Sequence, residues 1–288
     1  GPGTSRGLWC LRGWWTGLAG VRQNERMSRP AVIAHRGASA TDAEHTLAAY
    51  LRAIQDGADG LECDVRLTAD GHLVCVHDRN LRRTAAQKKL VSSSNLADLA
   101  ELDFASWKNP WADLDDEATE RDPELSKVLT MRRLLEVVAS ADRRIELAIE
   151  TKHPTRYAGL VERRLVELLA EFGWTGSDSP VRVMSFSWVA VKRVERLAPS
   201  LDVVYLMDRP GAWARSRPVA SPDWIAGPGI ELLQQHPVLI RRIGRKSRVH
   251  VWTVNTAADI DLCLDLGVEA IITDRPAFAS DYLDAAGL

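Results

Sequence analysis

Residues 35–78 read HRGASATDAEHTLAAYLRAIQDGADGLECDVRLTADGHLVCVHD and contain three polar clusters. Each cluster ends an apolar or β-prone run of the kind that predicts a buried strand. The clusters are His35-Arg36-Gly37, Glu62-Cys63-Asp64 and His77-Asp78. Because polar side chains at the ends of several buried strands are typical of a barrel active site, we expect the three clusters to form one site.

The two carboxylates of the second cluster are two positions apart in a predicted strand. Successive side chains of a strand alternate between its faces, so Glu62 and Asp64 should point the same way. Two carboxylates on one inner face repel each other unless a positive charge lies between them, and a hard divalent cation usually supplies it. His35 and His77 add a general acid and a general base. Arg36 adds a fixed cation suited to a phosphate oxygen.

Four longer motifs follow one another through this stretch in a specific order. They are HRGA from His35, EHTL from Glu44, GADGLECDV from Gly57 and DGHLVCVHD from Asp70. In order and spacing they resemble the glycerophosphodiester phosphodiesterase family. One position departs from the family's usual Pro-Glu-Asn-Thr, because this chain has Ala43-Glu44-His45-Thr46. We expect Glu44 and His45 either to support the site near His35 or to serve only at the start of a helix.

The resemblance implies both a reaction and the residues that perform it. The reaction is hydrolysis of a glycerophosphodiester to sn-glycerol 3-phosphate and an alcohol, with one divalent cation, Mg2+ or Ca2+, and with a cyclic phosphate intermediate. Metal ligands would be Glu62, Asp64 and Glu150, the base His35, the acid His77, the phosphate contacts Arg36 and Lys152, and the glycerol contact Trp252. The residues by themselves do not separate the two histidine roles or the two metals.

The rest of the chain favours an α/β fold, a single (β/α)8 TIM barrel over residues 31–288. After residue 126, helical patterns alternate with strand-like runs at 144–150, 181–187, 201–207, 224–227, 249–255 and 269–274. Regular alternation implies parallel strands joined by right-handed crossovers. The alternation fails at about 79–126, which we interpret as a small insertion after the second strand, over the barrel mouth. Its Trp107 and Trp111 would line the entrance or form a small core of their own.

Composition narrows the class of partner. The formal net charge is −2 and no basic stripe stands out, which argues against a nucleic-acid surface and for a small-molecule substrate. The four cysteines, at positions 10, 63, 75 and 263, show no metal-ligand spacing and fit a reducing cytoplasm. No run approaches the length of a membrane span. Head-group preference and oligomeric state are not readable.

Residues 1–30 differ from the remainder of the chain. They begin Gly1-Pro2-Gly3, carry three tryptophans, and reach Met27 just before the first predicted strand. We interpret them as a flexible leader made of a cloning remnant and translated upstream sequence. The alternative is a secretory signal, although Arg12 interrupts its apolar core.

Two alternative functions stay open beside the main one. A related barrel phospholipase of the D type would act on lysophospholipids and would need an apolar mouth. A catalytically dead binding barrel would lack at least one of the residues named above, and none is missing.

Overall fold

Eight parallel strands form the centre of the computed structural model, which describes residues 29–108 and 123–288. The hydrogen-bonded order is β7-β6-β5-β4-β2-β1-β9-β8. Isolated parallel bridges from Ala226 to Val249 and from Gly229 to Trp252 join the two ends and nearly close the ring. The strands are β1 Ala31–His35, β2 Gly60–Leu67, β4 Glu146–Thr151, β5 Val181–Ser185, β6 Asp202–Met207, β7 Ile225–Pro228, β8 His250–Trp252 and β9 Ala270–Thr273.

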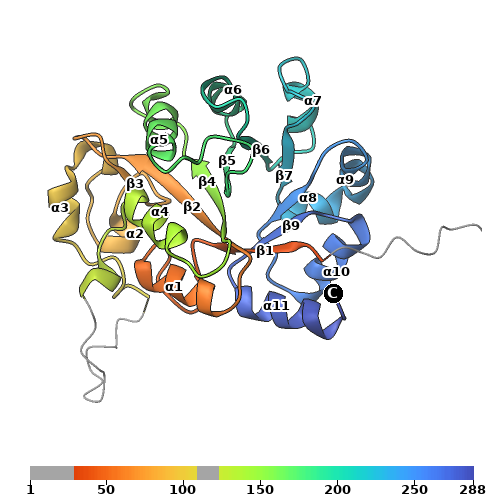
Figure 1. Ribbon diagram of the computed structural model, residues 1–288, viewed down its shortest axis with the longest axis horizontal. Helices are drawn as coiled ribbons and strands as arrows, with labels where there is room; N and C mark the ends of the chain where they lie inside the picture. The colour runs from red at the N-terminus through yellow and green to blue at the C-terminus, as the bar shows by residue number, and fades with distance from the viewer. Residues whose placement is uncertain (1–28, 109–122) are drawn as a thin grey trace, which may run out of the picture.

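Helices follow the strands and surround the ring (Figure 1). A small apolar cluster that includes Ile33, Ala148 and Ile272 fills the interior of the barrel, and a larger one packs between strands and helices. The predicted TIM barrel is confirmed. The α-helices are α1 Leu47–Gln55, α2 Arg82–Ala85, α3 Leu96–Ala100, α4 Met131–Ala139, α5 Leu160–Glu171, α6 Trp188–Leu197, α7 Ala212–Ser216, α8 Ile230–Gln235, α9 Pro237–Gly244, α10 Ala257–Leu266 and α11 Pro276–Ala285.

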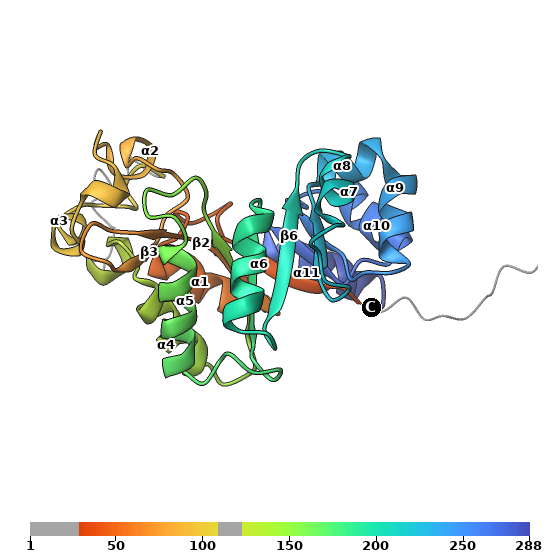
Figure 2. The same cartoon turned by 90° about the horizontal axis from the view of Figure 1, so that it is seen from above.

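The chain between β2 and β4 leaves the barrel pattern. A short strand, β3 (Leu73–Cys75), runs back antiparallel along β2. It is followed by α2, the 3-10 helix η1 (Val91–Ser93), α3 and a second 3-10 turn, η3 (Pro123–Ser126). Figures 1 and 2 both place α2 and α3 at the end of the molecule opposite α9 and α10.

This segment has an apolar core of its own. Buried members include Val76, Leu81, Leu99 and Phe104. Trp107 is outside that core and lines a cavity beside His35, so of the two alternatives Trp107 fits the one in which it lines the entrance. Trp111 and the leader up to residue 28 lie outside the described residues.

The first helix begins later than its sequence pattern predicts. We expect a start near Glu44 with Thr41 or Asp42 as its cap, but α1 starts at Leu47 and Thr46 is the N-cap. His45 has a φ of 60°, which is not helical, and the Thr46 hydroxyl accepts the Ala49 N–H at 3.2 Å. Glu44 and His45, which precede the cap, are therefore free to contribute side chains to the site.

Among the residues that the structure describes, none of the helices combines the length and apolar composition needed to cross a bilayer.

Candidate active site

A sharp turn after β1 delivers the first cluster to the carboxyl end of the barrel. Arg36 and Gly37 have φ values of 57° and 85°, and a Cβ on Gly37 would lie 2.6 Å from the Ala49 backbone. Only glycine fits that position without strain. The turn directs the Arg36 N–H toward the Glu62 carboxylate, whose Oε2 accepts it at 3.1 Å.

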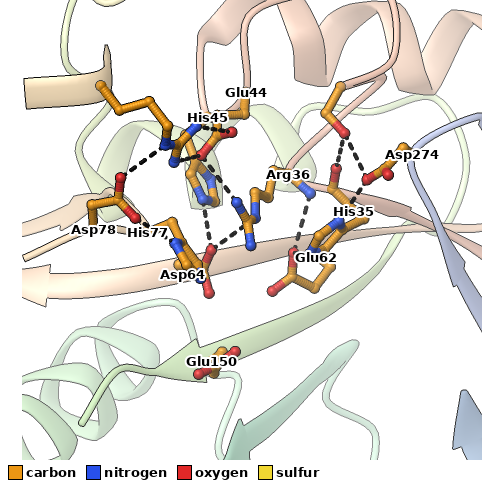
Figure 3. Close-up of polar contacts among 12 residues, drawn as sticks. His35, Arg36, Glu44, His45, Glu62, Asp64, His77, Asp78, Glu150 and Asp274 are labelled. Carbon is orange, nitrogen blue, oxygen red and sulfur yellow. Dashed lines mark hydrogen bonds and ion pairs between the residues drawn. The ribbon is translucent and has the colours of Figure 1, made fainter. Parts of the chain in front are cut away.

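Three carboxylates meet at this end of the sheet, two from β2 and one from β4. The parallel register pairs Asp64 with Glu150, and Glu62 lies one inward position earlier on β2. One oxygen of each residue lies within 4.8 Å of the others, and all three residues are buried. Figure 3 shows Glu150 on β4, the strand next to the one that carries the two β2 carboxylates. The expected Glu62, Asp64 and Glu150 are therefore brought together.

Confinement of three acids has a large electrostatic effect. Burial, and then the charge of Asp64, raise the pKa of Glu62 well above its usual range and that of Glu150 to about 8. Burial alone would also raise the pKa of Asp64, but the hydrogen bond from His45 and the charge of Lys152 hold it well below its usual range. The site therefore has more carboxylates than its own cations keep ionised.

Two basic side chains partly offset this charge. Lys152 Nζ lies 2.8 Å from Glu150 Oε1 and 3.3 Å from Asp64 Oδ1. Arg36 Nε lies 3.1 Å from Asp64 Oδ2, and its Nη1 donates to Glu44 at 3.1 Å. Both side chains are largely buried beside the carboxylates, where a phosphate would find them already positioned.

A carboxylate contacts Nδ1 of each of the two proposed catalytic histidines, His35 and His77. His35 Nδ1 lies 2.6 Å from Asp274, and His77 Nδ1 lies 2.7 Å from Asp78. The Nε2 atom of His35 points into the site, 3.9 Å from Glu62 Oε2. Burial lowers the pKa of His77, which favours its neutral form near pH 7. Both rings thus have one fixed nitrogen and one that faces the cavity.

A cavity of about 140 Å³ joins these groups to the barrel wall. His35, His77, Glu62, Glu150, Lys152 and Arg36 line one part of it, and Phe186, Trp252, Met184 and Leu206 line another. The Trp252 indole donates to the Gly227 carbonyl at 2.8 Å and packs edge to face on Phe186, with ring centroids 5.3 Å apart.

Some supporting residues escape sequence reasoning. Asp274 is fixed by Asn255 at 2.6 Å and by Ser39 at 3.0 Å, and it directly follows β9. Because active-site residues of such barrels lie at the carboxyl ends of the strands, the position of Asp274 just after β9 could have identified it as a site residue. His45 Nε2 donates to Asp64 at 2.9 Å, and the His45 backbone N–H donates to the carbonyl of Arg36, the residue after His35, so of its two expected roles the contacts of His45 fit support of the site. Its left-handed backbone turns the ring inward.

The sequence model of the Glycerophosphoryl diester phosphodiesterase family matches residues 35–278. A Mycobacterium tuberculosis protein named probable glycerophosphodiester phosphodiesterase 1 is 43% identical over 260 residues, covering 88% of this chain and 93% of the relative. The Bacillus subtilis glycerophosphodiester phosphodiesterase is 33% identical, with 86% of this chain and 84% of the relative covered.

Solved structures agree with the barrel fold. An Oleispira antarctica phosphodiesterase, solved in complex with the product sn-glycerol-3-phosphate, superposes with a TM-score of 0.74 at 25% identity. The match covers 88% of this chain and 97% of that one. A glycerophosphodiester phosphodiesterase from Parabacteroides distasonis gives a TM-score of 0.71, also at 25% identity, over 90% and 98% of the two chains.

Proposed function

This chain belongs to the glycerophosphoryl diester phosphodiesterase family and is an enzyme of that kind; we propose that it cleaves glycerophosphodiesters to sn-glycerol 3-phosphate and an alcohol with His35 as base and His77 as acid. The observation that carries this proposal is a single cavity lined by two carboxylate-held histidines, buried acids and two basic side chains. The product bound to the Oleispira antarctica phosphodiesterase supports the same glycerol phosphate product here.

The donor set fits one hard divalent cation. Glu62, Asp64 and Glu150 offer only oxygen atoms, close together and buried. Burial, and then the charge of Asp64, raise the pKa values of Glu62 and Glu150. We propose these three residues as its ligands, with Mg2+ and Ca2+ both compatible. When bound, the cation would supply positive charge against the phosphoryl oxygens.

The remaining phosphate contacts come from Arg36 and Lys152. Both are fixed by neighbouring carboxylates, so little side-chain freedom is lost when a phosphate arrives. Trp252 and Phe186 form the aromatic wall that the glycerol carbons would contact. The substrate thus lies with its phosphorus near the acids and its glycerol on the aromatic side.

Proton transfer follows from the two histidines. With Nδ1 held by Asp274, His35 Nε2 can take the proton of a glycerol hydroxyl. To act as the acid, His77 must carry a proton on both ring nitrogens; Asp78 then accepts from Nδ1, and Nε2 can give its proton to the departing alkoxide. The 2-hydroxyl of glycerol is attached to the substrate, which gives it a large effective molarity and lowers the barrier by several kcal/mol relative to free water. Its attack forms a five-membered cyclic phosphate that water then opens.

The test measures release of the alcohol from glycerophosphocholine, glycerophosphoethanolamine, glycerophosphoinositol and lysophospholipids, with and without EDTA, and identifies the other product as glycerol 3-phosphate or lysophosphatidate. We expect release from the three substrates that carry no acyl chain. Turnover should be lost when EDTA is added and in the variant Glu62→Gln. A 2-deoxy analogue should bind without reacting, and a 1,2-cyclic phosphate should accumulate transiently. If the deoxy analogue reacted as fast as the normal substrate, water would be the nucleophile in place of the 2-hydroxyl. A preference for lysophospholipids would favour the phospholipase D alternative.

A further inference from the structure

A second, smaller cavity lies beside the candidate active site, and Lys152 lines both. Arg66 from β2, Arg79 from the segment after β3, and Arg156 from the loop between β4 and α5 complete its basic lining. The other lining residues are apolar or neutral, so none of the lining residues in the described chain is acidic. Lys152 is already paired with Glu150 and Asp64, so the positive potential of this cavity comes mainly from the three arginines.

The charges of these arginines are not neutralised by the chain. Within residues 29–108 and 123–288, Arg79 and Arg156 form no ion pair; Arg156 lies over the Tyr157 ring, 5.7 Å from its centroid. Arg83, four positions after Arg79, behaves differently, because it contacts both Glu44 and Asp78 at 2.6–2.8 Å. Unpaired cations that converge on a cavity repel one another, and a bound anion would relieve that repulsion.

Hydrogen bonds hold the walls of the cavity in place. The Tyr157 hydroxyl donates to the Ser92 carbonyl at 2.8 Å and so ties the β4–α5 loop to η1. Arg66 donates to the His77 carbonyl through Nε at 2.9 Å and through Nη2 at 2.6 Å. The cavity is therefore built from fixed segments, and one of them carries the proposed general acid.

The basic cavity lies on the side of the active site from which the alcohol would leave. The aromatic wall of Trp252 and Phe186 lines only the active-site cavity, while the basic cavity adjoins Lys152 and the backbone of His77. If His77 protonates the departing alkoxide, the alcohol leaves on the side of the basic cavity. A substituent on that alcohol would reach past Lys152 toward Arg79 and Arg156.

We propose that the basic cavity binds a second anionic group, a phosphate or a carboxylate, carried by the alcohol of the substrate. The inference rests on the proposed function and narrows its substrate class to glycerophosphodiesters with an anionic alcohol. Arg79 and Arg156 act as specificity-determining residues, because both line the basic cavity and neither is among the residues that line the active-site cavity.

The test compares glycerophosphoinositol with glycerophosphoinositol 4-phosphate, since both release sn-glycerol 3-phosphate and differ only in the second anion. The wild-type enzyme should have the higher kcat/KM for the phosphorylated substrate. The double variant Arg79→Gln/Arg156→Gln should lower that value by about 10-fold or more, mainly through KM, because two charge-assisted contacts are lost. Its kcat/KM for glycerophosphoinositol should not change.

Arg82→Gln is the matched control, since Arg82 is exposed on the same segment, makes no ion pair in the described chain, and does not line the cavity. It should leave both substrates unaffected. If the double variant lost kcat/KM equally for both substrates, the arginines would only attract anions in general, and the proposed subsite would be overturned. Equal kcat/KM values for the two substrates in the wild-type enzyme would overturn it as well. Absence of glycerol 3-phosphate release from every substrate is a separate result, and it would overturn the proposed function itself.

Discussion

The two proposed catalytic histidines share one local design. In each, Nδ1 is bonded to a carboxylate, which fixes the tautomer that leaves Nε2 toward the cavity. The carboxylate on His35 is itself held, because Asp274 accepts hydrogen bonds from Asn255 and Ser39. Burial alone would raise the pKa of Asp274, but its bonds to His35 and Asn255 hold that pKa at about 2, so it stays ionised. Asp274 is therefore a positioning residue for His35.

We predict that Asp274→Asn lowers kcat by roughly 10- to 100-fold with little change in KM, because an amide can present an N–H to His35 Nδ1 and disfavour the required tautomer. The rate profile against pH should also change on the limb that reports the base. Steady-state kinetics between pH 5 and 9 would measure both effects. The control is Asp281→Asn, the same change at an exposed position of α11. An unaltered kcat would exclude the positioning role.

Sequence reasoning finds the side chains that face the cavity better than those behind them. His35, Glu62, Asp64, His77 and Glu150 meet as expected, because strand alternation and motif order determine where they point. Their supporting partners are harder to find, since contacts between distant segments depend on barrel closure. Asp274, for example, is 239 positions from the histidine that it holds. The catalytic roles remain predictions for the assays above.

Among the elements, helix starts are predicted less well than strands. The pattern predicts a helix from Leu125 to Ala139, but α4 begins only at Met131, where the Thr130 hydroxyl accepts the Arg133 N–H at 3.2 Å. Apolar periodicity extends into the preceding turn, whereas the cap is decided by one side chain and its backbone. The predicted strand ranges overlap the observed strands, since a strand buried on both faces produces a continuous apolar run.

The start of β8 places a histidine at the opposite end of the barrel from the site. His250 Nε2 lies 3.2 Å from Arg182 Nη1, and since arginine can only donate, that nitrogen must accept. Burial has the largest effect and lowers the pKa of His250, although Glu269 at 3.5 Å opposes the shift. Arg248 also faces it and lowers its pKa further. The folded protein therefore keeps His250 neutral.

We predict a loss of stability with acid that depends on His250. Because its folded pKa is depressed, the unfolded chain binds a proton that the native one does not, so stability is full above about pH 6.5 and falls below it. The slope for one such group is at most about 1.4 kcal/mol per pH unit. Urea unfolding at pH 7.5, 6.5 and 5.5 should show a smaller acid loss in His250→Gln. Parallel curves for the two proteins would contradict the assignment.

For the molecule as a whole, the barrel is complete without the first 26 residues, which lie outside the described part of the chain. β1 pairs with β2 and β9 from Ala31 onward, and Arg29 just before it contacts Asp59 at 2.7 Å. We predict that deleting residues 1–26 leaves turnover and Tm essentially unchanged, as measured by the release assay and by calorimetry. A large loss of Tm would show that the leader packs on the barrel.

The three carboxylates at the barrel mouth link cation binding to the stability of the whole molecule. A cation that binds only the folded chain stabilises it by about 2.7 kcal/mol at 100 times its Kd, so Mg2+ or Ca2+ should raise the Tm of chelator-treated protein by about 5 °C or more. Since burial and then Asp64 raise the pKa of Glu150 to about 8, the cation must displace a proton at neutral pH.

The rise in Tm should therefore grow as the pH increases from about 6.5 to 8.5, over the range in which Glu150 loses its proton. Glu62→Gln should remove most of the rise, because it deletes one of three anionic ligands. Glu101→Gln, at an exposed acid after α3 that is not among the residues lining the active-site cavity, should keep it in full. If neither Mg2+ nor Ca2+ changed the Tm across this pH range, the three acids would hold no cation. The positive charge near the phosphate would then come from Arg36 and Lys152 alone.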